Sequence, residues 1–281
     1  MVLPAGARVR MHASRLALAV PAYRGQIQVQ HLEQLHNLIG ACAYSQVQAG
    51  QQKHTDRMLV GQKPVFQFAG IIHIVSCSIA KARNLMLFGA LKSNAIDWLL
   101  MCDADNYFEG DSRAILRMLA DAERKEAVVV VAPILRRDGR YNVLVDEDEQ
   151  GLVCVDANQR QYDRKCRSLT PADFRGKMLP VTRAGSGFMA LLVPWFRAHW
   201  PVTPWFQFAQ APREDGQPHE IGEDHVFCDG VRQRGGLILC DGRLEPYHEG
   251  APYHLVQGAA ATPTVAEVVN DAAPPVEAHG Q

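Results

Sequence analysis

The chain has 281 residues, of which 47% are hydrophobic and 21% are charged, and its formal net charge is −1. This length suffices for one large domain with its own core. The near-neutral charge excludes the overall basic excess that is typical of nucleic-acid-binding proteins, and no apolar run approaches the roughly 20 residues of a membrane span. Seven cysteines are scattered without paired spacing or a zinc-type Cys-x-x-Cys pattern. We therefore expect free thiols and a cytoplasmic location.

The beginning of the chain predicts an arm followed by a strand, a turn and a helix. Residues 1–15 form the expected N-terminal arm. Three arginines precede the apolar run Leu16–Val20, a pattern that superficially resembles a signal peptide. The run is too short for that role and Pro21 ends it, so we interpret it as a first buried strand. Apolar residues spaced by three and four then predict an amphipathic helix over residues 28–44.

Strands and helices continue to alternate up to residue 133. Residues 65–75 are apolar and β-branched and predict a strand or hairpin, and Ser78 is a candidate cap for a helix that ends near Lys92. A second cap, at Asp111 or Ser112, precedes a helix and then a strand over residues 127–133. This alternation predicts an α/β fold with a central, mostly parallel sheet flanked by helices.

The stretch from Ile96 to Asp105 is the most informative part of the sequence. Trp98–Cys102 is a short apolar run, which predicts a buried strand, and two carboxylates follow it, at Asp103 and Asp105. Ionised carboxylates are unfavourable in a buried place unless they are paired or bound to a cation. Because ligands bind at the carboxyl ends of strands in open α/β sheets, the two side chains are candidate ligands of a hard divalent cation. The alternative is that they only cap a turn.

The second half of the chain is less regular. Residues 136–181 are charged and predict short strands and loops outside the first sheet, and Gly185-Ser186-Gly187 then leads into an apolar strand. A short helix is expected over residues 194–200. Aromatic side chains follow in a proline-rich loop, and they form either a lid over a substrate or a satellite core, of which we favour the second: Trp205, Phe206 and Phe208.

A helix with two acidic residues in its first turn is predicted after Gly222. Glu223 and Asp224 occupy that turn, where the helix dipole stabilises anions, and Gly235 marks the end of the helix. A strand and a segment with a single histidine, His248, come next. Residues 258–281 lack a periodic apolar face and predict a disordered tail.

Six segments together resemble glycosyltransferases of the GT-A fold, in the broad family 2-like group with phage and bacterial members. The resemblance covers roughly residues 16–250 and is carried by segments in a fixed order: Ala-Val-Pro-Ala-Tyr, Ala82-Arg83-Asn84, Leu-Leu-Met-Cys-Asp-Ala-Asp, Gly185-Ser186-Gly187-Phe188, Gly-Glu-Asp-His-Val-Phe-Cys and Tyr247-His248-Glu249-Gly250. It implies a single Rossmann-like GT-A domain over residues 16–257. Within it, residues 16–135 would bind the nucleotide sugar and residues 136–257 would face the acceptor.

The resemblance also implies roles for individual residues. The nucleotide-diphosphate sugar, expected to be a UDP-sugar, would contact Pro21, Ala22, Tyr23, Arg83, Asn84, Asp103 and Gly187. The metal, Mn²⁺ or Mg²⁺, would be bound by Asp103, Asp105 and His248. Glu223 and Asp224 would be the catalytic acidic pair, with Asp224 as the base in an inverting enzyme. A positioned carboxylate base typically contributes ~10²–10⁴-fold to the rate.

The sequence leaves the substrates open. The acceptor hydroxyl would belong to a glycan, a small molecule or a modified (hydroxymethylated) DNA base, and neither the donor sugar, the stereochemical outcome nor the oligomeric state is predicted. One alternative is a sugar-phosphate nucleotidyltransferase, although the turn after the first strand has only one glycine and one arginine, Gly25 and Arg24. The other alternative is a non-catalytic subunit that keeps the fold and binds a partner.

Overall fold

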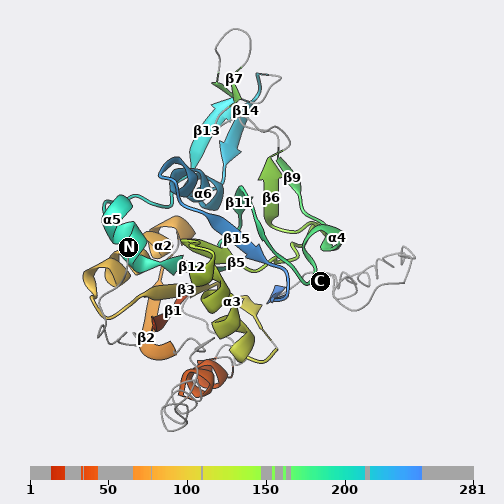
Figure 1. Ribbon diagram of the computed structural model, residues 1–281. Helices are drawn as coiled ribbons and strands as arrows, with labels where there is room; N and C mark the ends of the chain where they lie inside the picture. The colour runs from red at the N-terminus through yellow and green to blue at the C-terminus, as the bar shows by residue number, and fades with distance from the viewer. Residues whose placement is uncertain are drawn as a thin grey trace, which may run out of the picture.

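The computed structural model describes residues 14–22, 33, 35–43, 66–76, 78–108, 110–146, 154–155, 161–162, 166–212 and 216–248. The predictions for Tyr23, for most of the N-terminal arm and for the tail lie outside these residues. Within them the fold is mixed α/β, as predicted, with a large and mostly parallel central sheet flanked by helices (Figure 1). No described helix combines the length and the apolar character needed to cross a bilayer.

The central sheet has seven strands in the spatial order β10 (Met178–Pro180), β15 (Ile238–Asp241), β5 (Val129–Val131), β12 (Phe188–Leu192), β3 (Trp98–Cys102), β1 (Ser14–Ala22) and β2 (Phe66–Val75). β1 pairs in parallel with both β2 and β3, and β15 pairs in parallel with β5. β12 runs antiparallel between β3 and β5, and β10 runs antiparallel along β15 at the edge. The carboxyl ends of β1, β3, β5 and β15 therefore meet at one edge of the sheet.

Helices cover both faces of the sheet because its central strands are apolar on both sides. Leu99 and Met101 of β3 face one core cluster, and Trp98 and Leu100 face the other. The first cluster contains side chains from four described helices: α2 (Ile79–Lys92), α4 (Pro171–Phe174), α5 (Val193–His199) and α6 (Glu223–Gln233). The second contains side chains from helical residues 35–43 and from α3 (Arg113–Arg124). Such two-sided burial is what an apolar run without alternation predicts.

The remaining described elements are a short helix, α4 (Pro171–Phe174), and several smaller sheets beside the central sheet. Figure 1 shows β13, β14 and β7 extending away from the central sheet. The strand pairs and their bounds are β11 (Arg183–Ala184) with β6 (Val143–Asp146), β6 with β9 (Cys166–Ser168), β13 (Ala209–Pro212) with β14 (Pro218–Ile221), β16 (Tyr247–His248) with β4 (Asn106–Tyr107), and β7 (Cys154–Val155) with β8 (Gln161–Tyr162).

Most predicted elements are confirmed within the described residues, and the capping predictions are partly confirmed. The Ser78 hydroxyl accepts a hydrogen bond from the Lys81 backbone N–H at 3.4 Å. Of the two candidate caps of α3, Asp111 accepts from the Arg113 backbone N–H at 2.9 Å, whereas the Ser112 side chain forms no capping bond. Gly235 ends α6 with a φ of +77°, a conformation that glycine adopts without strain.

Two expectations need correction. The segment 136–181 does not stay outside the first sheet, because β10 at its end pairs with β15 and extends the central sheet. The aromatic loop does not form a satellite core. Trp205 and Phe206 are buried in the first core cluster, and the Phe206 ring stacks on Phe227 of α6 with a centroid distance of 4.2 Å. Phe208 is 51% exposed.

Candidate functional site

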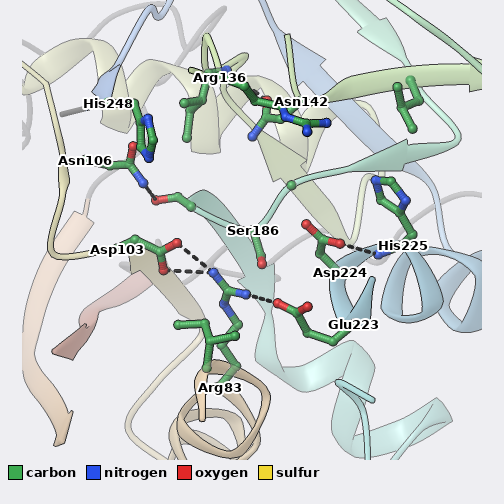
Figure 2. A pocket seen from close by; sticks show the side chains of 15 residues that line it. Arg83, Asp103, Asn106, Arg136, Asn142, Ser186, Glu223, Asp224, His225 and His248 are labelled. Carbon is green, nitrogen blue, oxygen red and sulfur yellow. Dashed lines mark hydrogen bonds and ion pairs between the residues drawn. The ribbon is translucent and has the colours of Figure 1, made fainter. Parts of the chain in front are cut away.

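A polar cavity of about 420 Å³ lies at the carboxyl end of β3. Side chains reach it from β4, β16, the start of α2, the loop before β12 and the start of α6 (Figure 2). Two groups face each other across it. We call Asp103 and His248 the β3 wall, and Glu223 and Asp224 the α6 wall. The cavity thus collects polar groups that are more than a hundred residues apart in sequence.

Asp103 follows β3 directly and begins a tight turn. Its backbone N–H donates to the Gly187 carbonyl at 2.9 Å, and its own carbonyl accepts from the Asn106 N–H at 2.9 Å. These bonds fix the carboxylate at the end of the strand, where the sequence predicts it. Both carboxylate oxygens accept from Arg83 Nη2, at 2.9 and 2.7 Å. The side chain is therefore already paired with a cation.

Arg83 connects the two walls. It comes from the first half of α2, is only 4% exposed, and its Nη1 donates to the Glu223 carboxylate while Nη2 holds Asp103. Burial alone lowers the pKa of an arginine, but the charges of Asp103 and Glu223 outweigh it and raise the pKa of Arg83. The guanidinium is thus a permanently charged bridge between β3 and α6.

The two acidic residues of the α6 wall have different environments. Glu223 is 7% exposed and ion-paired with Arg83, and burial raises the pKa of its carboxyl group despite that partner. Asp224 lines the cavity and accepts a hydrogen bond from the His225 backbone N–H at 2.8 Å. Within the described part of the chain, Asp224 forms no ion pair. Asp224 therefore presents a carboxylate to the cavity without a directly bound cation.

Asp105 and His248 lie against each other, as the resemblance implies. The distance from His248 Nε2 to Asp105 Oδ2 is 3.3 Å, and the hydrogen bond from His248 holds the pKa of Asp105 below its ordinary value. One carboxylate and one imidazole suit Mn²⁺ as ligands. The third expected ligand, Asp103, faces Arg83, and among the described residues no three such side chains form a metal-binding group. Two of the three predicted ligands therefore lie together, and the third is paired with Arg83.

The residues predicted to bind the donor do not all line the cavity. Pro21 and Ala22 end β1 at the same sheet edge as Asp103, and Gly187 lines the cavity. A Cβ atom on Gly187 would lie 2.5 Å from Asn106 Nδ2 and 3.3 Å from Asp103 Oδ2, so glycine permits this close approach. Tyr23 lies outside the described residues.

Asn84 differs from its expected role. Its Oδ1 accepts from the backbone N–H groups of Trp205 and Phe206, at 2.8 and 3.0 Å, and its Nδ2 donates to the Phe206 carbonyl at 2.7 Å. The side chain does not line the cavity, because these three bonds hold it against the aromatic loop. We therefore interpret Asn84 as the residue that anchors this loop to α2.

Several cavity residues received no role from the sequence: Asn106, Arg136, Asn142, Ser186 and His225. The hydroxyl of Ser186 and Oδ1 of Asn106 are buried without a hydrogen-bond partner in the described part of the chain. Asn106 directly follows the aspartate pair, and Ser186 lies between two glycines. The positions of these two residues within the motifs could have indicated that they belong to the site. The neighbouring sequence does not indicate which of their polar atoms are left without a partner.

Comparisons with known proteins give no family. No protein-family model matches the chain, and no curated protein matches it. The chain is similar to the crystal structure of A197 from STIV, with 14% identity, a TM-score of 0.49, and coverage of 83% of this chain and 85% of that one. It is also similar to GalNAc-T7 with UDP, GalNAc and Mn²⁺, with 12% identity, a TM-score of 0.47, and coverage of 85% of this chain but 45% of that one. The similarities concern the path of the backbone and identify no reaction.

Proposed function

We propose that the protein is a glycosyltransferase that moves a sugar from a nucleotide-diphosphate sugar to an acceptor hydroxyl. The observation that carries this proposal is the cavity, in which Asp103 and His248 of the β3 wall face Asp224 of the α6 wall. The cavity lies at the carboxyl edge of the parallel strands, where open α/β sheets bind ligands. Its volume of about 420 Å³ falls in the range of small-molecule sites.

Asp224 is the residue that takes the proton of the acceptor hydroxyl. A hydroxyl is a poor nucleophile until a base removes its proton, and a carboxylate that is held in a buried ion pair is not free to receive that proton. Glu223 is held in such a pair with Arg83, whereas Asp224 forms no ion pair in the described chain. In this proposal Glu223 keeps the start of α6 in place, and Asp224 acts on the acceptor.

Asp105 and His248 would hold the divalent cation, Mn²⁺ or Mg²⁺. Such an ion neutralises the negative charge that develops on a diphosphate leaving group. The 3.3 Å contact between His248 Nε2 and Asp105 Oδ2 supports their joint role. Asp103 would be a third ligand only if its carboxylate were no longer paired with Arg83, whose guanidinium would then be able to bind a phosphate. Pro21, Ala22 and Tyr23 would line the nucleotide pocket beside them.

The acceptor is proposed as a class only. A glycan, a small molecule and a hydroxymethylated DNA base each offer a hydroxyl, and the net charge of −1 gives no preference for nucleic acid. Acceptor specificity is expected to depend on residues 136–181 and 203–220, in the second half of the chain.

The test is hydrolysis of a panel of nucleotide sugars with Mn²⁺ or Mg²⁺, without acceptor and then with each acceptor class. We expect turnover of one donor, with UDP-sugars first, and loss of Mn²⁺ affinity in His248→Ala with an unchanged fold. Release of pyrophosphate from a sugar phosphate and a nucleoside triphosphate would instead identify a nucleotidyltransferase. Binding of nucleotide sugars without turnover under any condition would favour the non-catalytic subunit.

A further inference from the structure

Four cavity-lining residues each carry a buried polar atom without a hydrogen-bond partner in the described part of the chain, and two of these atoms belong to residues that lie opposite each other. These two atoms are Oδ1 of Asn106 and Nδ1 of His248. A buried polar atom without a partner destabilises the state in which it is unpaired. Two such atoms on neighbouring side chains therefore suggest a hydrogen bond that forms in one state of the site.

The pairing of β4 with β16 brings the two side chains together. Asn106 lies directly opposite His248 in this antiparallel pair, and both side chains line the cavity. Directly opposite residues have Cβ atoms about 4.5–5.5 Å apart and point to the same face. Figure 2 shows the Asn106 amide beside the His248 ring. The amide and the imidazole are therefore adjacent, and no hydrogen bond joins them in this structure.

The orientation of the Asn106 amide is set by Gly187. Nδ2 of Asn106 donates to the Gly187 carbonyl at 3.4 Å, so the amide nitrogen is turned toward β12 and Oδ1 is the atom that remains to accept a bond. The side chain fits there because residue 187 has no Cβ, which would lie 2.5 Å from Nδ2. Asn106 can therefore offer His248 an acceptor but not a donor.

The two tautomers of His248 have different consequences. If Nε2 carries the proton, it donates to Asp105 Oδ2 at 3.3 Å, and Nδ1 then has only a lone pair, which cannot bond to an amide oxygen. If Nδ1 carries the proton, it donates to Asn106 Oδ1, and the lone pair of Nε2 is left beside Asp105. Only the second tautomer presents a nitrogen ligand next to the carboxylate.

We propose that Asn106 is a positioning residue that selects the Nδ1–H tautomer of His248, so that Nε2 and Asp105 bind a divalent cation together. The inference rests on the cation role of His248 in the proposed function. Groups that hydrogen-bond the second nitrogen of a metal-binding histidine fix its tautomer and ring orientation, and their loss lowers metal affinity by about 10–100-fold. Asn106 contacts the cation only through His248.

A double-mutant cycle on the full chain tests this role, with Mn²⁺ alone as the probe and titration calorimetry as the measurement. Asn106→Leu keeps a similar volume and removes the acceptor, and we expect it to weaken Mn²⁺ binding by about 10–100-fold. In a His248→Ala background the same change should have no further effect. Asn94→Leu, at an exposed asparagine outside the cavity, is the control and should keep the wild-type affinity. A loss of equal size with and without His248 would overturn the proposal.

A second measurement needs no variant and so does not depend on the folding of Asn106→Leu. Imidazole ¹⁵N NMR of the wild-type chain with Zn²⁺ alone, a diamagnetic probe, reports which nitrogen of His248 is protonated. We expect a protonated Nδ1 and a metal-bound Nε2. A metal-bound Nδ1, or a His248 signal that Zn²⁺ leaves unchanged, refutes the inference. If the protein transfers sugar, the proposed function stands whichever nitrogen of His248 binds the metal. If Nδ1 is protonated and Nε2 binds the metal but no sugar is transferred, the proposed function is wrong and the inference stands.

Discussion

The two walls of the cavity carry carboxylates in different electrostatic states. On the β3 wall, Asp103 accepts two hydrogen bonds from Arg83, and its neighbour Asp105 lies against His248. On the α6 wall, Glu223 shares Arg83, and Asp224 is left without an ion pair in the described chain. The carboxylates of Asp103 and Glu223 are thus engaged in ion pairs with Arg83, whereas the carboxylate of Asp224 is not. This contrast gives different expectations for substitutions on each side.

The largest effect is expected on the α6 wall. Asp224→Asn keeps the size and the hydrogen bond at the helix start but removes the proposed base, so transfer should fall by ~10²–10⁴-fold. Donor affinity and melting temperature should stay close to those of the wild type. Steady-state kinetics with the identified donor, together with thermal unfolding, measure both quantities.

Asp229→Asn is the matched control on the same helix. Asp229 is ion-paired with Arg183 at 2.6 Å, so its loss should lower the free energy of unfolding, whereas turnover should stay close to that of the wild type. Transfer by Asp224→Asn at a rate near that of the wild type would show that Asp224 is not the base. The anomeric configuration of the product, measured by NMR, gives a further check, because retention excludes a single displacement with Asp224 as base.

Removal of the charge that connects the two walls should have the next largest effect. Arg83→Met leaves the carboxylates of Asp103 and Glu223 without their shared cation in a buried place, and we expect the free energy of unfolding to fall by about 3 kcal/mol. Urea titration at neutral pH measures the change. The control is Arg113→Met, since Arg113 pairs with Asp111 at the surface and such pairs contribute about 0–1 kcal/mol. Equal losses in the two variants would contradict a bridging role for Arg83.

A smaller effect is expected at Gly187, where the backbone passes close to the side chains of Asn106 and Asp103. Gly187→Ala would place a methyl group 2.5 Å from Asn106 Nδ2, and such overpacking destabilises a protein by about 1–3 kcal/mol. Gly40→Ala is the control, because a Cβ atom there meets nothing within 4 Å. Chemical denaturation of both variants checks the contrast. A stable Gly187→Ala variant would mean that Asn106 moves aside without loss.

The smallest effect concerns pH and the contact between Asp105 and His248. The pKa of Asp105 is lowered in the folded state, so its ionised form stabilises the fold at pH values above its ordinary pKa. This contribution is lost as the pH falls through the lowered pKa. Asp105→Asn should therefore be less stable at neutral pH, by no more than about 1 kcal/mol because the side chain is partly exposed. The difference should vanish in acid. Melting temperatures of both proteins across an acid titration test this sign, and a difference that grows toward low pH would contradict it.

The sequence was sufficient for the elements whose signals are local. The apolar run Trp98–Cys102 predicts β3 because five consecutive apolar residues of that kind are too few for a helix, and the structure has the strand with these bounds. The carboxylate pair then has to lie at the end of that strand. Ser78 and Gly235 mark helix ends through bonds and dihedral angles that depend on one or two neighbouring residues. The Asp-x-Asp motif is recognisable for the same reason, since its two carboxylates are only one residue apart.

Tertiary structure decided which polar atoms meet. Asn84 and Arg83 are adjacent on α2, yet Asn84 binds the aromatic loop and Arg83 enters the cavity, since neighbours on a helix point about 100° apart. The bridge from Asp103 to Glu223 spans 120 residues of sequence, and the pairing of Asn106 with His248 spans 142. Sequence patterns specify the residue types that can occupy a site, because propensity and periodicity act over a few residues. Contacts between distant segments depend on the packing of the whole sheet, and only the folded chain determines which charges are neutralised and which remain available for chemistry.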